Sequence, residues 1–392
     1  MPKLAPLAGT VRRGVFADLE GAIAERRSSG GDLTPLHIGD TYLAPPAAAR
    51  FDRVLGCSDA ELYAYGATIG TADLRAALAR HALEQGRALA VDPAKHVLVG
   101  VGATHALSCA VRAIVGAGDD VLLFSPYWPL AHGILKSAGA EVRELPLSSE
   151  LYRDPALDVG ARVEAALTPA TRAIYLITPN NPDGKVLRRG DLEAIAEIAR
   201  RRDLWIIADE VYADYLYDGR EHVSIATLPG MAERTLTAYS FSKSHALAGA
   251  RVGWVVAPED VVAHARRLAI HSVFNVPVVA QRSALAALAD ERWVRDARAV
   301  YVAARDRAVA RLSKTKLAFS VPDGGVYVFA DFGPVLGGRP LSELLKRAIG
   351  RGVLVAPGDA FGADFATWAR ICFTSTSIDD VERGLEALES VL

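Results

Sequence analysis

The 392-residue sequence contains little cysteine, and its three cysteines (Cys57, Cys109 and Cys372) lie far apart with no CxxC pair. Disulfide frameworks and structural zinc sites both depend on cysteines at short or repeated spacings. The sequence therefore predicts neither kind of site. Isolated thiols are typical of a reducing compartment, so we expect a cytoplasmic protein.

The sequence also lacks long uncharged runs and an excess of charge of either sign. Its longest stretches without a charged residue, such as 97–111, fall short of the roughly 20 residues that a membrane span needs. The first residues, MPKLAPLAGTVRRG, contain no sustained apolar segment of the signal-peptide type. The formal net charge is −2, which gives no electrostatic reason to expect nucleic acid or an anionic membrane as a partner.

What the sequence does contain is a regular alternation of short apolar runs and amphipathic stretches. The apolar runs predict strands at His96–Val99, Val121–Phe124, Arg172–Ile177, Leu204–Ala208, Thr235–Tyr239 and Val252–Ala257. Strands that are apolar throughout and separated by helices indicate a mostly parallel sheet sandwiched by helices. Only about a dozen residues join the last two strands, so one of them can run antiparallel.

After about residue 280 the pattern changes. A long helical stretch runs from Gln281 to Leu312 and is followed by the strand-like segments FSVPDGGVYVFADF and VLVAPG and by WARICFTS. The predicted fold class is therefore α/β, with a large domain and a smaller α+β domain built from both chain ends. We expect an N-terminal arm and part of the small domain over 1–50, the large cofactor-binding domain over 51–280, and the C-terminal small domain over 281–392.

Polar residues follow several predicted strands directly, and they include a lysine, Lys243, in the stretch SFSK. Ligands bind at this edge of a parallel sheet. The hydroxyls of Ser240 and Ser242 and the guanidinium of Arg251 are donors that suit a phosphate. A lysine beside a bound phosphate is desolvated, and its amine can attack an aldehyde. The plainer alternative is a solvated surface lysine.

Three other strand ends carry candidate polar groups. Asp209 follows a buried strand and either caps a helix or faces a protonated ring nitrogen, with Tyr212 three residues on. Asn181, in TPNNPDG, either belongs to a simple turn or donates toward a pocket. The Gly102-Ala103-Thr104 junction between strand and helix offers backbone donors to an anion.

Taken together, these segments resemble the aspartate-aminotransferase superfamily of pyridoxal-phosphate enzymes, in its class I and II group of fold type I. The resemblance covers most of the chain and keeps the order of the family's segments. The segments that carry it are YAYGATIGTADLRAALA, VGATHAL, SPYW, PNNPDGK, DEVYADYLY, YSFSK, ARVGW, GGVYVF and WARICFTS. An ordered series of this length is far more specific than any single motif.

The resemblance implies a role for each residue around the cofactor, pyridoxal 5'-phosphate. Lys243 would hold the cofactor aldehyde covalently and later move the substrate proton, and Asp209 would keep the pyridine nitrogen protonated. Asn181 and Tyr212 would hydrogen-bond the cofactor's phenolic oxygen. The residues implied at the phosphate are Gly102, Ala103, Thr104, Ser240, Ser242 and Arg251.

The resemblance also implies residues that contact the ring, the substrate and the partner subunit. Trp128 would stack on the cofactor ring, with Tyr127 as the alternative. Arg370 would bind the substrate α-carboxylate by two parallel hydrogen bonds, and the backbone at Gly39 would close over the substrate. Tyr65 would reach the phosphate held by the other subunit of a homodimer.

The implied function is transfer of an amino group between an L-amino acid and a 2-oxo acid, with Lys243 as the base. The alternative keeps fold and cofactor but catalyses β- or γ-elimination, ring closure or another rearrangement of an amino acid. A non-enzymatic regulator is disfavoured, because the first 50 residues contain no basic stretch and every catalytic position holds a competent side chain. The sequence has Thr104 where some aspartate-specific relatives have lysine, and His105 beside it is not diagnostic, so no dicarboxylate preference is implied.

Overall fold

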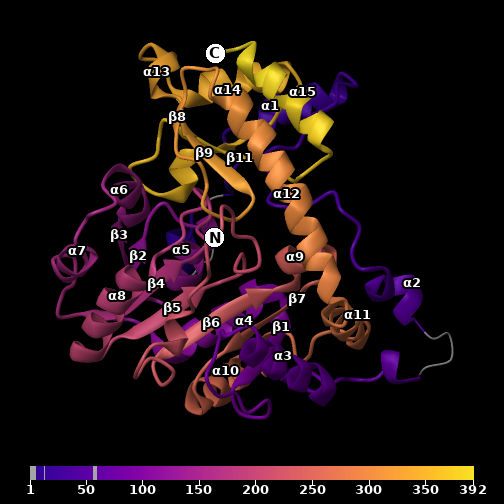
Figure 1. Cartoon of the computed structure of the whole chain (residues 1–392), viewed down its shortest axis with the longest axis vertical. Coiled ribbons are helices and arrows are strands. Elements are labelled where there is room, and N and C mark those ends of the chain that lie inside the picture. Colours follow the sequence, from indigo (N-terminus) through magenta and orange to yellow (C-terminus); the bar gives the residue numbers. More distant parts are fainter. Residues whose placement is uncertain (1–5, 13, 56–59) are drawn as a thin grey trace, which may run out of the picture.

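Two β-sheets organise the chain in the computed structural model, which describes residues 6–12, 14–55 and 60–392 (Figure 1). Cys57 lies outside the described residues, whereas Cys109 and Cys372 are buried and form no disulfide. Within the described ranges, no helix combines the length and the apolar character that crossing a membrane requires.

The larger sheet has seven strands in the order β1-β7-β6-β5-β4-β2-β3. The strands are β1 (Val97–Val101), β2 (Asp120–Phe124), β3 (Glu141–Leu145), β4 (Thr171–Ile177), β5 (Trp205–Asp209), β6 (Thr235–Ser240) and β7 (Val252–Val256). The pairs β2–β3, β2–β4, β4–β5 and β5–β6 are parallel. Strand β7 pairs antiparallel with both β1 and β6, so the expectation of one antiparallel strand at this end is confirmed.

Strand β3 is the strand of this sheet that the sequence pattern did not predict. It reads EVREL and lies at the edge of the sheet, where Glu141 and Arg143 are exposed. An edge strand with charged residues lacks the continuous apolar run that marks a strand buried on both faces.

Helices cover both faces of the larger sheet, because side chains alternate along each strand. Leu122 and Leu123, for example, pack into two different cores. One face is covered by α4 (Gly102–Ile114), α5 (Pro129–Ser137) and α10 (Glu259–Ser272). The other is covered by α3 (Ala72–Glu84), α6 (Leu147–Arg153), α7 (Val159–Glu164), α8 (Arg189–Arg201) and α11 (Val278–Leu288). The short α2 (Phe51–Val54) lies against α11.

The smaller sheet is antiparallel, with the order β10-β11-β9-β8. Its strands are β8 (Ala318–Phe319), β9 (Tyr327–Asp331), β10 (Ala356–Pro357) and β11 (Trp368–Cys372). The helices of this unit are α1 (Glu20–Ser28), α12 (Glu291–Leu312), α13 (Gly333–Leu336), α14 (Leu341–Gly350) and α15 (Ile378–Glu389). Thr34 forms a parallel bridge with Val353, and α1 packs against α14 (Figure 1).

Both chain ends therefore contribute to the smaller α+β unit, as the sequence predicts. The boundaries expected near residues 50 and 280 stay predictions.

The helical stretch predicted from Gln281 to Leu312 is two helices, α11 and α12, which are separated at Ala289 and Asp290. Asp290 has φ −99° and ψ 77°, which interrupts the helical conformation. The break redirects the chain from the core of the larger sheet to that of the smaller one. Helix α12 has 22 residues and so spans about 33 Å, which carries the chain between the two units (Figure 1).

Candidate active site

The carboxyl ends of β4, β5 and β6 meet at one edge of the larger sheet, where Asp209 pairs with Ile177 and Ala238. A pocket lies at this edge. It is lined by Ala103, Thr104, Leu107, Trp128, Ile177, Asn181, Asp209, Val211, Tyr212, Ser240, Ser242, Lys243 and Arg251. The structure thus brings together most residues that the sequence singled out. Those outside this lining are Gly102, Gly39, Arg370 and Tyr65.

Two glycines let the start of α4 approach Arg251. Gly102 has φ +74°, and a Cβ atom placed on it would lie 2.4 Å from Nη2 of Arg251. A Cβ atom on Gly253 would lie 2.2 Å from the backbone nitrogen of Ala103. The first backbone N–H groups of α4 have no partner within the helix, and together with the guanidinium they form a cradle of donors. This arrangement fits a phosphate group.

The short helix α9 (Phe241–Ser244) begins directly after β6 and carries Lys243. Its start is held by Ser240, whose Oγ accepts a hydrogen bond of 3.2 Å from the backbone nitrogen of Ser242. The Nζ of Lys243 donates to the carbonyl oxygen of Gly39, a residue far away in the sequence. Burial lowers the pKa of Lys243, and the positive charges of Arg370 and Arg251 lower it further. At a given pH, the amine of Lys243 is therefore neutral more often than that of a surface lysine.

Asp209 is the last residue of β5 and is buried, with 4% of its surface exposed. The chain after it forms a turn, so the helix that Asp209 could have capped is absent at residues 210–214. Its carboxylate accepts long hydrogen bonds from the backbone nitrogen of Val211 at 3.3 Å and from the hydroxyl of Tyr175 at 3.4 Å. No ion pair to Asp209 occurs among the described residues. Burial raises its pKa to about 6.

A buried carboxylate without a cationic partner is costly unless a ligand supplies the charge. Because Asp209 lines the pocket, the protonated ring nitrogen of pyridoxal phosphate fits this position.

Arg370 reaches the pocket region from β11 of the smaller sheet. Its Nη1 donates to Oδ1 of Asn181 at 2.9 Å, and its Nη2 donates to the carbonyl oxygen of His37 at 2.7 Å. Its guanidinium carbon lies 4.2 Å from the centre of the Tyr327 ring, and its Nε is buried without a hydrogen-bond partner. The guanidinium is therefore held by two hydrogen bonds and the Tyr327 ring, while its Nε–H stays without an acceptor.

Tyr327, at the start of β9, is a site residue that the sequence reasoning missed. Its hydroxyl lies 2.6 Å from that of Tyr212. A Cβ atom on Gly39 would lie 1.7 Å from the Tyr327 hydroxyl, so a glycine is needed there. The segment GGVYVF predicts a strand, but nothing in that pattern shows that its tyrosine reaches residues of the larger unit.

The contacts of the remaining candidate residues show which of them reach the pocket. Trp128 lines the pocket, whereas the hydroxyl of Tyr127 donates to Glu144 at 2.6 Å, away from the pocket. His105 is hydrogen-bonded to Ser272. Tyr65 does not reach the pocket of its own chain, and its side chain is 87% exposed.

Comparison with known proteins gives a consistent result. Residues 44–388 match the family described as "Aminotransferase class I and II". The chain is 37% identical to an arginine–pyruvate transaminase of Pseudomonas aeruginosa over 88% of this chain and 86% of the relative. It is 34% identical to aromatic-amino-acid aminotransferase 2 of Thermococcus litoralis over 85% of each chain.

The fold is similar to that of solved aminotransferases. A single mutant of Thermus thermophilus aspartate aminotransferase superposes with a TM-score of 0.90 at 29% identity, over all of both chains. An aromatic aminotransferase from Pyrococcus horikoshii superposes with a TM-score of 0.85 at 30% identity, over 94% of this chain and 98% of that one.

These matches favour amino-group transfer over elimination or ring closure, since the family and the relatives are named for transfer. The chain therefore belongs to the class I and II aminotransferases, enzymes that move an amino group between an amino acid and a 2-oxo acid.

Proposed function

We propose that the pocket at the edge of the larger sheet binds pyridoxal 5'-phosphate, the cofactor that this aminotransferase family uses. The observation that carries the proposal is Asp209, a buried carboxylate that lines the pocket and has no cationic partner among the described side chains. When bound, the cofactor supplies an electron sink that stabilises negative charge at the substrate α-carbon.

The residues that would hold the cofactor lie at the carboxyl ends of five strands, β1, β2, β4, β5 and β6, and Arg251 directly precedes β7. The start of α4 at Gly102, Ala103 and Thr104, together with Ser240, Ser242 and Arg251, would bind the phosphate. Asp209 would keep the ring nitrogen protonated, and Trp128 would pack on the ring. Asn181 and Tyr212 would donate to the phenolic oxygen.

Arg370 and Lys243 would act on the substrate. Arg370 would bind the α-carboxylate, because a guanidinium can form two parallel hydrogen bonds with a carboxylate. Lys243 would link to the cofactor aldehyde and, once released, its neutral amine would take up and return the proton at the α-carbon. The contact of Lys243 with the carbonyl of Gly39 supports this proposal, because it places the amine beside the segment that would close over the substrate.

The test is reduction of the purified protein with borohydride, followed by peptide mass spectrometry. We expect the cofactor on the peptide that contains Lys243. The variant Lys243→Ala should still bind the cofactor reversibly, since the phosphate cradle and Asp209 remain, but it should not turn over. Label on another lysine, or no label at all, would overturn the assignment.

The amino donor can be identified with a panel of amino acids, each offered with pyruvate or 2-oxoglutarate. The P. aeruginosa relative is named for arginine and pyruvate and a mouse relative for kynurenine and oxoglutarate, which makes both 2-oxo acids reasonable first acceptors. Transfer requires turnover that depends on the 2-oxo acid. Release of ammonia without it would support the lyase alternative.

We also propose a homodimer in the cytoplasm. Large apolar side chains are exposed in residues 51–55 and 60–65 and at a position that contacts Tyr65. They are Phe51, Leu55, Tyr63, Tyr65 and Phe274. A two-fold axis brings the same patch of both subunits together, so Tyr65 of each would reach the phosphate of the other. The buried thiols of Cys109 and Cys372 support a reducing location.

A further inference from the structure

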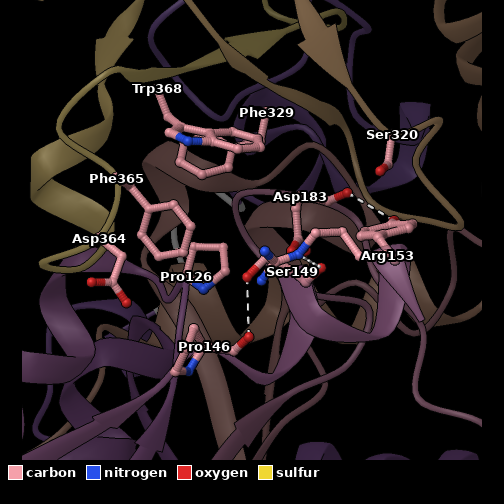
Figure 2. Close-up of a pocket in the computed structure, with 11 residues that line it drawn as sticks. Pro126, Pro146, Ser149, Arg153, Asp183, Ser320, Phe329, Asp364, Phe365 and Trp368 are labelled. Atoms are coloured by element: carbon pink, nitrogen blue, oxygen red, sulfur yellow. Dashed lines mark hydrogen bonds between the residues drawn. The ribbon is translucent and has the colours of Figure 1, made fainter. Parts of the chain in front are cut away.

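A second cavity of about 360 Å³ lies between the two sheets, and it shares no lining residue with the active-site pocket (Figure 2). On one side it is bounded by residues after β2 and β4 and in α6, and on the other by residues of β9 and β11 and their flanking loops. Pockets for small molecules have volumes of about 300–1,000 Å³. The cavity is therefore large enough for one small ligand.

One wall of this interdomain cavity is aromatic. Figure 2 shows Trp368, Phe329 and Phe365 grouped on the side of the smaller sheet. The rings of Phe329 and Trp368 are stacked, with centres 5.1 Å apart and an angle of 29° between their planes. Phe365 meets Trp368 edge to face at 5.9 Å. Such a wall favours a flat apolar group, and the faces of its rings also attract cations.

Across from this wall lies Asp183, a carboxylate that is 7% exposed. Its Oδ1 accepts hydrogen bonds from Nδ2 of Asn180 at 2.8 Å and from the backbone nitrogen of Lys185 at 3.0 Å. Its Oδ2 is buried and has no hydrogen-bond partner. Burial raises the pKa of Asp183 to about 6, so the group is ionised at about pH 8.

The nearby cations do not pair with Asp183. Nζ of Lys185 lies 3.3 Å from Asp323 and 4.3 Å from the centre of the Tyr152 ring. Asp323 also pairs with Arg220 at 2.7 Å. The remaining charged residues of the lining, Arg153 and Asp364, are exposed and opposite in sign. The buried charge of the interdomain cavity is therefore the carboxylate of Asp183, which forms no ion pair with the described cations.

We propose that the interdomain cavity is a second ligand site, for a protonated amine attached to an aromatic ring. The ring packs against Trp368, Phe329 and Phe365, and the ammonium group pairs with the carboxylate of Asp183, which lines the cavity. A neutral ring compound would leave the carboxylate unpaired, and an anionic one would be repelled by it. The site is separate from the one proposed for pyridoxal phosphate, so neither proposal depends on the other.

The test uses three probes with the same phenylethyl group and different charge, titrated calorimetrically into the cofactor-loaded enzyme at about pH 8. The cation is N,N-dimethyl-2-phenylethylamine, a tertiary amine that cannot form an imine with the cofactor aldehyde. The neutral probe is 4-phenyl-2-butanol, and the anion is 3-phenylpropionate. We expect the cation to bind on the order of 10- to 100-fold more tightly than the neutral probe, as one charged hydrogen bond implies.

Two matched pairs of variants locate the binding. Asp183→Asn should weaken binding of the cation by the same factor, whereas Asp364→Asn, at an exposed position, should change it little. Trp368→Leu should weaken binding of all three probes, whereas Trp128→Leu, in the active-site pocket, should not.

The proposal is wrong if the neutral or anionic probe binds as tightly as the cation, or if the cation does not bind at millimolar concentration. It is equally wrong if Trp128→Leu abolishes binding while Trp368→Leu retains it. Because the three-probe comparison uses the unaltered protein, it stays decisive even if a variant fails to fold.

Discussion

The hydroxyl oxygens of Tyr212 and Tyr327 lie 2.6 Å apart, although 115 positions separate the two residues in the sequence. Tyr212 belongs to the turn after β5 and lines the active-site pocket, whereas Tyr327 begins β9 and packs under Arg370. Both side chains are 1% exposed. This pair therefore joins the side of the site proposed to bind the cofactor to the residue proposed to bind the substrate carboxylate.

Replacing Tyr327 by phenylalanine tests this link. The variant keeps the ring beneath Arg370 but leaves the buried Tyr212 hydroxyl without its partner. We expect the free energy of unfolding to fall by about 1–3 kcal/mol, the cost of an unsatisfied buried polar group. Urea denaturation of the cofactor-free protein measures the change, with Tyr42→Phe as the control because Tyr42 is 40% exposed. Equal stability of the two variants would contradict the link.

Asp209 should make the cofactor-free protein less stable as the pH rises. Burial raises its pKa in the folded chain from 3.8 to about 6, so between these values the folded state holds more protons than the unfolded state. Stability from this group is therefore greatest below about pH 4 and is lost as the pH rises through 6. The loss is on the order of 3 kcal/mol, since each unit of pKa difference corresponds to about 1.4 kcal/mol.

The measurement is urea denaturation of the cofactor-free protein and of Asp209→Asn across this pH range. Asp183, whose pKa is also raised to about 6, is present in both proteins and cancels in the difference. Identical pH profiles for the two proteins would show that burial does not raise the pKa of Asp209.

Arg370→Lys should impair substrate binding more than turnover. A lysine cannot form two parallel hydrogen bonds with a carboxylate, so we expect kcat/KM for the amino acid to fall by about 10- to 100-fold, mainly through KM. Steady-state kinetics provide the test. Arg143→Lys, at an exposed position of β3, serves as the control. An unchanged KM in Arg370→Lys would exclude Arg370 as the carboxylate ligand.

Tyr65→Phe should weaken cofactor retention by about 1.5–3 kcal/mol, the value of one hydrogen bond to a charged group. Mixed dimers of Tyr65→Phe and Lys243→Ala subunits show where Tyr65 acts. If it acts across the interface, one site of each mixed dimer carries both defects and the other carries neither, so activity returns at the intact site. A fully active monomer, or mixed dimers whose lysine-bearing site still loses cofactor, would rule out the shared site.

The positions of most strands along the chain, and the residues at their carboxyl ends, could be predicted from the sequence, because both depend on local patterns. Asp209, Asn181 and Lys243 each come at or just after the end of a mostly apolar run, and that pattern persists however the chain folds. The edge strand β3 escaped prediction because its charged residues remove the apolar run. The break at Asp290 escaped because both helices around it have the same periodicity.

By itself, then, the sequence determined the fold class and most of the residues that line the active-site pocket. Only the tertiary structure placed Gly39 against Lys243, Arg370 against Asn181, and Tyr327 against Tyr212. It also formed the interdomain cavity, whose aromatic wall and carboxylate come from different sheets. Local pattern follows from the chemistry of neighbouring residues, whereas these contacts join residues more than 100 positions apart and exist only after both sheets have packed.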